Sequence, residues 1–327
     1  MREPVTSAAR FGAENWSHRL SSQHVDEIDA ALADVGRSDR PLLTVRARDF
    51  AVPRLAAELG RIVNLVEQRD GFAVVRGLDA GRYNVHGLRM LLWAMGQHLG
   101  TPVPQTTDGH MLRSVPATAD AGFHSGGSDV SAFLVTGAGA SASFVSSESL
   151  VREVHARRPD LAERLSGRYA FDRGAEPVPG ELPYRLLPLT CRAGGRLSMR
   201  YRRDEIEAAH ARPDLPSLGS ADLDLFDLVD EIASDRRYRV DVQLDAGDLV
   251  LVDNYSTLHM LGAENQASPQ LLRLWLTLPT GRDLPTGFTW ESPGYGGRGG
   301  RGGAVPRDVI SLPSGCAGPK SRLATAV

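Results

Sequence analysis

Residues 245–279 read DAGDLVLVDNYSTLHMLGAENQASPQLLRLWLTLP. The apolar run 249–252 and the longer run 271–278 predict two buried strands joined by a polar loop. That loop carries Asn254 and one histidine, His259. A histidine at the end of a buried strand can present a ring nitrogen to a cavity, but most such histidines are packed or solvated. His259 alone therefore does not define a metal site.

A second histidine belongs to residues 122–147, GFHSGGSDVSAFLVTGAGASASFVSS, where His124 precedes another apolar strand. The pair His124 and His259 is the only combination of histidines placed in this way. The others fall on predicted helices or loops with no shared spacing, and we interpret them as surface or packing residues. Among these, His110 is set apart by its position in the loop before the His124 segment.

Composition places the chain among ordinary globular proteins. Its 327 residues are 42% hydrophobic and 24% charged, enough to bury a sizeable core. The formal net charge of -3 gives no field suited to nucleic acid or to an anionic membrane. Cys191 and Cys316 match no zinc or haem spacing. With no apolar run of bilayer length and no export signal, we expect a cytoplasmic protein that acts without a membrane.

The remaining pattern predicts helices first and then strands with helices inserted. Expected helices cover 21–35, 53–68, 84–99, 147–158, 159–166 and 220–236, the last capped by Ser220, and further expected strands cover 71–77, 196–201 and 238–244. Residues 101–118 and 170–190 are expected to be loop-rich or irregular. This order favours an α+β fold built on a β-sandwich or barrel over a doubly wound sheet.

The two ends of the chain differ from the middle. We expect an N-terminal arm and helix over 1–39, a main domain over 40–285 and a Gly/Arg-rich tail over 286–327. The tract SPGYGGRGGRGG at 292–303 has the composition of an RNA-binding segment. One short tract on a mildly acidic chain is better interpreted as a loop or tail, so no nucleic-acid partner is expected.

With both histidine segments in view, residues 40–285 resemble the TauD/TfdA-like (clavaminate synthase-like) iron(II)/2-oxoglutarate dioxygenases. The residues that carry the resemblance are Gly71-Phe72 to Gly77, Leu99-Gly100-Thr101-Pro102 with Gln105, Phe123-His124 with Gly127 and Asp129, Val145-Ser146-Ser147, Gly247-Asp248, His259, and Arg273-Leu274-Trp275-Leu276. The resemblance implies a double-stranded β-helix (jelly roll) core with flanking helices.

The family chemistry defines what the resemblance implies for the site. Two histidines and one carboxylate hold Fe(II) on one face, which leaves positions for 2-oxoglutarate and O2. Decarboxylation of 2-oxoglutarate is coupled to oxidation of the substrate, and an arginine binds the far carboxylate of 2-oxoglutarate. By this resemblance His124 and His259 are the expected metal ligands, and Arg273 is the expected cofactor anchor.

The chain departs from the family at the third ligand. The family motif is His-x-Asp/Glu, and here it is His124-Ser125-Gly126. Gly126 could leave a metal position open for chloride, as in the 2-oxoglutarate halogenases. Alternatively, Asp129 could replace the carboxylate, although the family often has an aspartate there that supports the site or binds substrate. In the third interpretation the site no longer activates oxygen in the family way.

The cofactor anchor departs as well. Of the family's two arginines, four apart in the last strand, the second falls on Arg273 and the first on Pro269. The hydroxyl residue that assists 2-oxoglutarate falls near Ala142, so the adjacent Ser141 is the candidate. Gln105, Asp129 and Asn254 are assigned to the substrate side of the site.

These residues predict a non-haem iron, 2-oxoglutarate-dependent enzyme acting on a small molecule of specialised metabolism. A halogenase-type site, with Gly126 making room for chloride, is the leading expectation. The alternatives are a repurposed family member whose reaction does not need 2-oxoglutarate, and a catalytically silent binding protein. Substrate identity and oligomeric state do not follow from the sequence.

Overall fold

The computed structural model describes residues 16–38, 40–106, 109–117, 122–173, 182–263, 270–285 and 288. Its helices are α2 (Ser22–Arg37), α3 (Pro53–Leu65), α4 (Val85–Leu99), α5 (Ser147–Arg157), α6 (Pro159–Ala162), α7 (Arg203–His210) and α8 (Ser220–Ser234). Short turns of other helix types are η1 (Leu42–Thr44), η2 (Ala47–Asp49), η3 (Val66–Asp70), η4 (Ala80–Arg82) and η5 (Glu163–Ser166). The first helix begins as expected, because the Ser21 side chain accepts a hydrogen bond from the N–H of His24.

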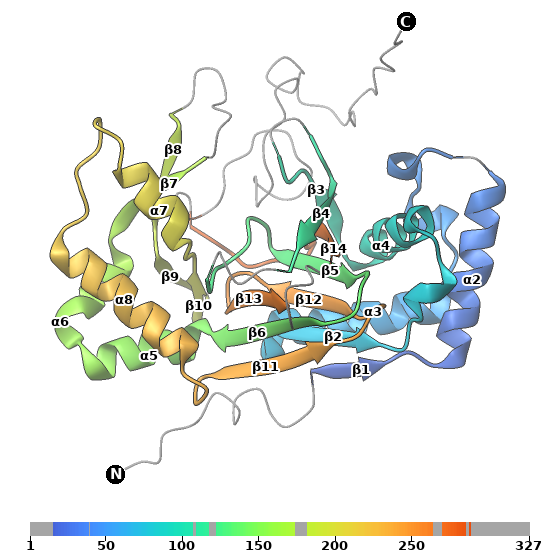
Figure 1. Ribbon diagram of the computed structural model, residues 1–327, viewed down its shortest axis with the longest axis horizontal. Coiled ribbons are helices and arrows are strands. Elements are labelled where there is room, and N and C mark those ends of the chain that lie inside the picture. Colours follow the sequence, from blue (N-terminus) through green and yellow to red (C-terminus); the bar gives the residue numbers. More distant parts are fainter. Residues whose placement is uncertain are drawn as a thin grey trace, which may run out of the picture.

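The strands form two principal sheets (Figure 1). A seven-stranded sheet has the order β1-β2-β12-β5-β14-β3, with β4 also paired to β14, and a three-stranded sheet has the order β11-β6-β13. Their bounds are β1 (Ser17–Arg19), β2 (Phe72–Arg76), β3 (Thr101–Val103), β4 (Leu112–Pro116), β5 (Val130–Val135), β6 (Ala140–Ser146), β11 (Arg239–Leu244), β12 (Leu249–Asp253), β13 (Thr257–Ala263) and β14 (Gln270–Thr277). Two hairpins, β7 (Arg168–Asp172) with β8 (Tyr184–Pro188) and β9 (Thr190–Ala193) with β10 (Arg196–Met199), complete the set.

The inner faces of the two principal sheets enclose one apolar core. Phe72 of β2 stacks on Phe144 of β6, with ring centroids 3.9 Å apart and planes within 9°. Buried apolar residues of both sheets surround this pair, including Val74, Phe133, Ala142, Val242, Val250, Leu261 and Leu271. Sheets that face each other across such a core make a jelly-roll sandwich. The predicted α+β fold with a double-stranded β-helix core is confirmed.

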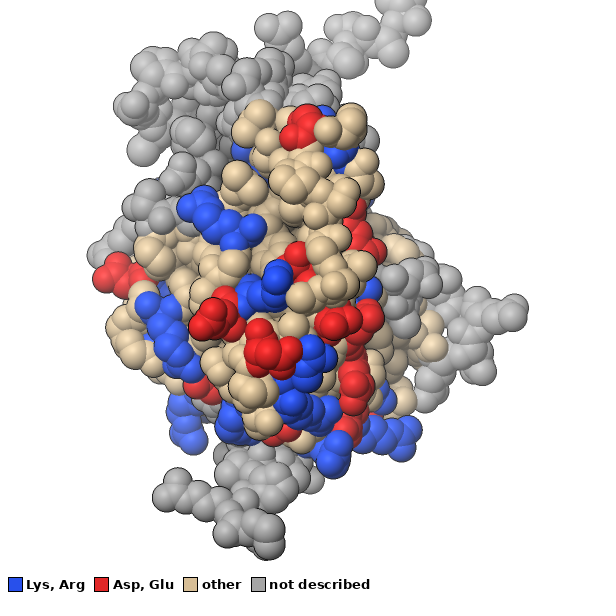
Figure 2. Space-filling view, turned by 90° about the vertical axis from the view of Figure 1, so that its left-hand side faces the viewer, with Lys and Arg blue, Asp and Glu red and all other residues tan. Residues whose placement is uncertain are grey.

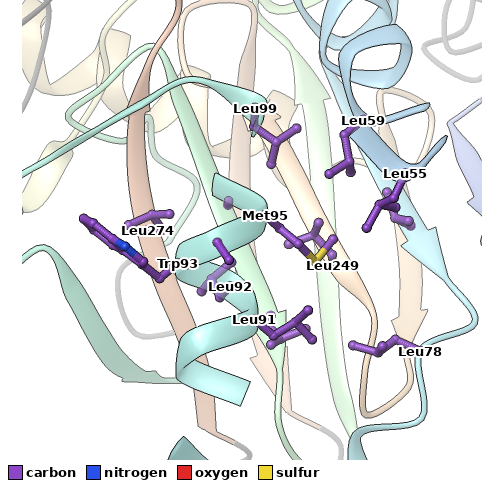
Figure 3. Close-up of a cluster of buried hydrophobic side chains, with 14 of the residues drawn as sticks. Leu55, Leu59, Leu78, Leu91, Leu92, Trp93, Met95, Leu99, Leu249 and Leu274 are labelled. Carbon is purple, nitrogen blue, oxygen red and sulfur yellow. The ribbon is translucent and has the colours of Figure 1, made fainter. Parts of the chain in front are cut away.

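Helices cover the other face of the large sheet. Figure 3 shows α4 and α3 side by side over this face of the sheet, with Leu91, Leu92 and Met95 of α4 in one cluster with Leu249 of β12 and Leu274 of β14. Because both of its faces are covered, β12 is buried at every position and reads as a continuous apolar run. Helix α2 contributes to the same core, so the helix expected in segment 1–39 packs on the main domain. The proposed domain boundaries themselves stay a prediction.

Several expectations for local structure were wrong. His259 lies inside strand β13 rather than in a loop, because 257–263 pairs with β6 along its whole length. Residues 101–118 contain β3 and β4, and 170–190 contain parts of the two hairpins. Helix α8 is capped by Gly219 in place of Ser220. The strands form because they pair with strands that are distant in the sequence, and the start of α8 depends on the backbone conformation of the residues before it. Neither cause leaves a local signal in the sequence.

The surface shown in Figure 2, at the end of the molecule that carries α5, α6 and α8, has acidic and basic side chains interspersed. Ion pairs join them, including Arg158–Asp160 at 2.6 Å and Arg203–Asp227 at 2.7 Å. This face has no field of a single sign to attract a nucleic acid. Within the described residues, no helix combines the length and apolar character that a membrane span requires.

Candidate active site

The structure brings His124 and His259 together. Their backbones form a two-residue antiparallel bridge, with N–H to carbonyl distances of 3.0 and 2.9 Å. The ring centroids lie 4.6 Å apart with an interplanar angle of 47°. Phe133 of β5 lies 5.5 Å from the His259 ring on the inner face of the large sheet. The two rings therefore lie at the end of the jelly roll where the His124 segment bridges to β13.

Both imidazoles are held in their neutral form. Burial, followed by the positive charge of Arg202, lowers the pKa of His124 to about 4. Burial also lowers the pKa of His259, with His124 and Arg273 as the next causes. Nδ1 of His124 lies 3.0 Å from the carbonyl oxygen of Gly122, which fixes that nitrogen as a donor and leaves the lone pair of Nε2 available for a metal.

One ring nitrogen of His259 lacks a hydrogen-bond partner among the described residues. Its Nδ1 is buried, and no described residue is within hydrogen-bonding distance of it. A buried polar atom without a partner costs about 1–3 kcal/mol. Two neutral imidazoles, one of them incompletely satisfied, are a donor set that suits a transition metal. The residues therefore fit Fe(II) as two of its protein ligands.

Residue 126 has no room for a third protein ligand. The N–H of Gly126 donates to Oδ1 of Asn254 at 3.0 Å. A Cβ atom at this position would lie 2.6 Å from Asn254 Oδ1 and 2.7 Å from Ser131 Oγ. Over the described parts of the chain, no group of three His, Cys, Asp or Glu side chains is placed to hold a metal. The space next to Gly126 is filled by an amide.

Asn254 and Asp129, both assigned to substrate, use their polar atoms within the protein. The Asn254 amide nitrogen donates to the carbonyl of Ser128 at 2.9 Å and to the Ser131 hydroxyl at 3.0 Å. Asp129 accepts hydrogen bonds from the Tyr255 hydroxyl at 3.1 Å and from the N–H of Leu278 at 2.8 Å. Through these bonds, Asn254 and Asp129 hold the His124 segment against β12 and β14.

Arg273 points into the sandwich from β14. Its Nε donates to Oε1 of Gln105 at 2.6 Å, and the Gln105 amide nitrogen donates back to the carbonyl of Arg273 at 2.7 Å and to that of Met111 at 2.9 Å. Burial, followed by the charges of Arg113 and Arg202, lowers the pKa of Arg273 to about 10, so the guanidinium stays charged at neutral pH. Gln105, assigned to substrate, positions the arginine in this structure.

Ser141 is not brought to the site. On β6 the buried residues Ala140, Ala142 and Phe144 face the core, and Ser141 lies on the opposite face. It pairs in register with Gly262 of β13 and Gln243 of β11. Pro269, where the family's first arginine falls, lies outside the described residues.

Residues near the site also include some that the sequence did not reveal. Arg202 is brought near the histidines because the carbonyl of the preceding residue, Tyr201, accepts a hydrogen bond from the N–H of Ser125. The guanidinium of Arg202 donates to Asp204 at 2.9 Å. Arg113 of β4 stands opposite Arg273 in register. No motif marks either position, and Arg113 could be found only from the pairing of β4 with β14.

Comparison with known proteins fits this geometry. The family model described as "Taurine catabolism dioxygenase TauD, TfdA family" matches residues 38–275. The chain belongs to this family. It is 26% identical over 324 residues to FR-33289 synthase of Streptomyces rubellomurinus (strain ATCC 31215), covering 88% of this chain and 95% of that protein.

Solved structures share the fold. Asparagine oxygenase in complex with Fe(II), 2S,3S-3-hydroxyasparagine and succinate aligns with a TM-score of 0.61 at 15% identity, over 89% of this chain and all of that chain. The non-haem iron oxygenase OrfP in complex with Fe, succinate and (3R,4R)-dihydroxy-L-Arg aligns with a TM-score of 0.57 at 18% identity, over 80% and 93% of the two chains. Family membership identifies the chain as an iron(II)/2-oxoglutarate-dependent oxygenase.

Proposed function

We propose that this chain oxygenates a small molecule of specialised metabolism, with Fe(II) held by His124 and His259 and 2-oxoglutarate held by Arg273. The observation that carries the proposal is the convergence of these three side chains, from β13, the His124 segment and β14, on the inner face of one sandwich, with His259 buried and the other two half-buried. FR-33289 synthase, asparagine oxygenase and OrfP support it as relatives named for synthesis or oxygenation of small molecules.

The chain's own residues have defined tasks in this proposal. When bound, iron(II) and 2-oxoglutarate supply the oxidative decarboxylation that is coupled to oxidation of a substrate C–H bond. The carbonyl of Gly122 holds the tautomer of His124, and the bridge to His259 fixes the spacing of the two rings. Gln105 orients the guanidinium of Arg273. The aromatic ring of Phe133 excludes water beside His259.

A halogenase-type reaction is the second candidate, because Gly126 supplies no carboxylate to the metal. The surroundings of Gly126 favour oxygenation over this candidate. Its N–H is already bound by Asn254, and the amide lies 2.6 Å from the position of a Cβ atom, so the missing side chain does not leave a free cavity there.

Turnover of 2-oxoglutarate tests the proposal. Purified protein supplied with Fe(II), O2 and 2-oxoglutarate should form succinate, and His124→Ala and His259→Ala should each abolish this. The matched control is His86→Ala at an exposed position of α4. Succinate formation that does not depend on either histidine would overturn the assignment of the ligands. Turnover that requires added chloride would favour halogenation instead.

A further inference from the structure

Two arginines stand directly opposite each other on neighbouring strands. The register of β4 against β14 pairs Arg113 with Arg273. Residues paired in this way lie about 5 Å apart at Cβ and project from the same face of the sheet. Like charges placed directly opposite destabilise a sheet. Among the described residues, neither guanidinium has a carboxylate within ion-pairing distance.

Arg113 is exposed at the rim of the sheet and Arg273 is half-buried, and the repulsion between them affects Arg273. After burial, the charge of Arg113 is the largest cause of the lowered pKa of Arg273, followed by that of Arg202. Gln105 is bound to Nε of Arg273, and no described residue accepts a hydrogen bond from its terminal nitrogens. An anion placed between Arg113 and Arg273 would remove the repulsion and satisfy these donors.

A further hydrogen-bond donor, the indole of Trp275, lies on β14 together with Arg273. Trp275 is two residues beyond Arg273 and faces the same side, and its ring lies 5.0 Å from the guanidinium carbon of Arg273. The indole nitrogen is buried and has no hydrogen-bond partner among the described residues. Because an indole N–H can only donate, its missing partner must be an acceptor. The ring itself is held against Gly127, where a Cβ atom would lie 2.7 Å from it.

We propose that Arg113 and the indole N–H of Trp275 join Arg273 in binding the distal carboxylate of 2-oxoglutarate. This inference rests on the proposed function and extends it, because it adds two residues to the single arginine expected as the anchor. A carboxylate has about four lone-pair positions, enough for all three donors. The added donors compensate for Ala142, which stands where the resemblance places an assisting hydroxyl.

The test compares 2-oxoglutarate with 2-oxovalerate, which has the same chain length and the same 2-oxo acid group but no distal carboxylate. Binding of each acid to the Mn(II)-loaded full-length protein is measured by calorimetry. We expect Arg113→Gln to weaken 2-oxoglutarate about tenfold and Trp275→Phe about threefold, with 2-oxovalerate unchanged. Arg37→Gln on exposed α2 is the matched charge control and should change neither acid.

The outcomes separate the inference from the proposed function. If Arg113→Gln or Trp275→Phe binds 2-oxoglutarate as tightly as the unchanged protein does, the inference is overturned for that residue. Equal weakening of both acids would also overturn it, since that result indicates disturbance of the whole site. If the unchanged protein binds neither acid, the proposed function fails before the inference is reached. Melting curves of each variant verify that it is folded.

Discussion

Gln105 and Arg273 are joined in both directions. The guanidinium Nε donates to the side-chain oxygen of Gln105 at 2.6 Å, and the Gln105 amide donates to the backbone carbonyl of Arg273 at 2.7 Å. Gln105 is itself held by the carbonyl of Met111 at 2.9 Å. This closed set of bonds fixes the direction of the guanidinium before any cofactor arrives, which reduces the entropy lost on binding.

Gln105→Leu should therefore weaken 2-oxoglutarate binding without removing the charge that attracts it. The variant retains the volume of the side chain but loses every bond to Arg273. We expect a loss of about tenfold in affinity for 2-oxoglutarate and a smaller change for 2-oxovalerate, measured by calorimetry on metal-loaded protein. An affinity equal to that of the unchanged protein would show that Gln105 does not orient Arg273.

Restoring the family motif at position 126 should fail. In Gly126→Asp the new Cβ would meet Asn254 and Ser131 at 2.6 and 2.7 Å, and a carboxylate would be forced against a buried amide. We expect a loss of at least about 2 kcal/mol in the free energy of unfolding, measured with urea. Gly126→Ala isolates the steric part of this cost.

The double variant Gly126→Ala with Asn254→Gly provides the control for that explanation. Removing the amide relieves the contact, so the two changes should cost less together than the sum of their separate costs. Strict additivity would contradict the conclusion that Asn254 fills the space beside Gly126.

Breaking the buried ion pair between Arg282 and Asp253, next to Asn254 in the chain, should be strongly destabilising. Nη2 of Arg282 lies 2.7 Å from Oδ2 of Asp253, with both side chains less than 10% exposed. Among the described residues, Arg282→Met leaves the carboxylate with only the Tyr255 N–H and the Ser256 hydroxyl as donors. Because an unpaired buried charge is costly, we expect a loss of about 3 kcal/mol in the free energy of unfolding.

The surface pair Arg158–Asp160 is the matched comparison for this prediction. Both of its side chains are at least 42% exposed, so Arg158→Ala should change stability by less than about 1 kcal/mol. Similar losses for the two variants would indicate that burial does not set the contribution of the Arg282–Asp253 pair.

Metal retention should require both histidines. Each of His124→Ala and His259→Ala removes one of two imidazoles that are already brought together by a backbone bridge. We expect each variant to lose at least about a hundredfold in affinity for Fe(II), measured by anaerobic equilibrium dialysis. His86→Ala, on the exposed part of α4, should retain the affinity of the unchanged protein. Loss of metal in only one of the two variants would contradict a shared site.

The sequence carried enough information for most of the fold. Apolar runs such as 249–252 and capped helices such as that at Ser21 have strong local signals, and the structure confirms them. The pairing of β4 and β13 did not follow, because their partners are distant in the chain and their own residues are partly polar. His259 was therefore expected in a loop although it lies inside a strand.

The candidate site was predictable only in part, for the same reason. His124, His259 and Arg273 were found through the resemblance to a family, and the structure places them together. The tasks of Gln105 and Asn254 depend on which atoms lie opposite them, and spacing along the chain does not contain that information. Arg113 was missed because its segment has no strand pattern.

In the proposed site, two histidines and Arg273 bind Fe(II) and 2-oxoglutarate together. Anaerobic titration of the protein with both, monitored by the weak visible charge-transfer band of the chelated complex, tests it most directly. We predict a band in the unchanged protein that is lost in His259→Ala and is the same with and without chloride. A protein that retains no iron and forms no band would contradict binding of iron and 2-oxoglutarate at His124, His259 and Arg273.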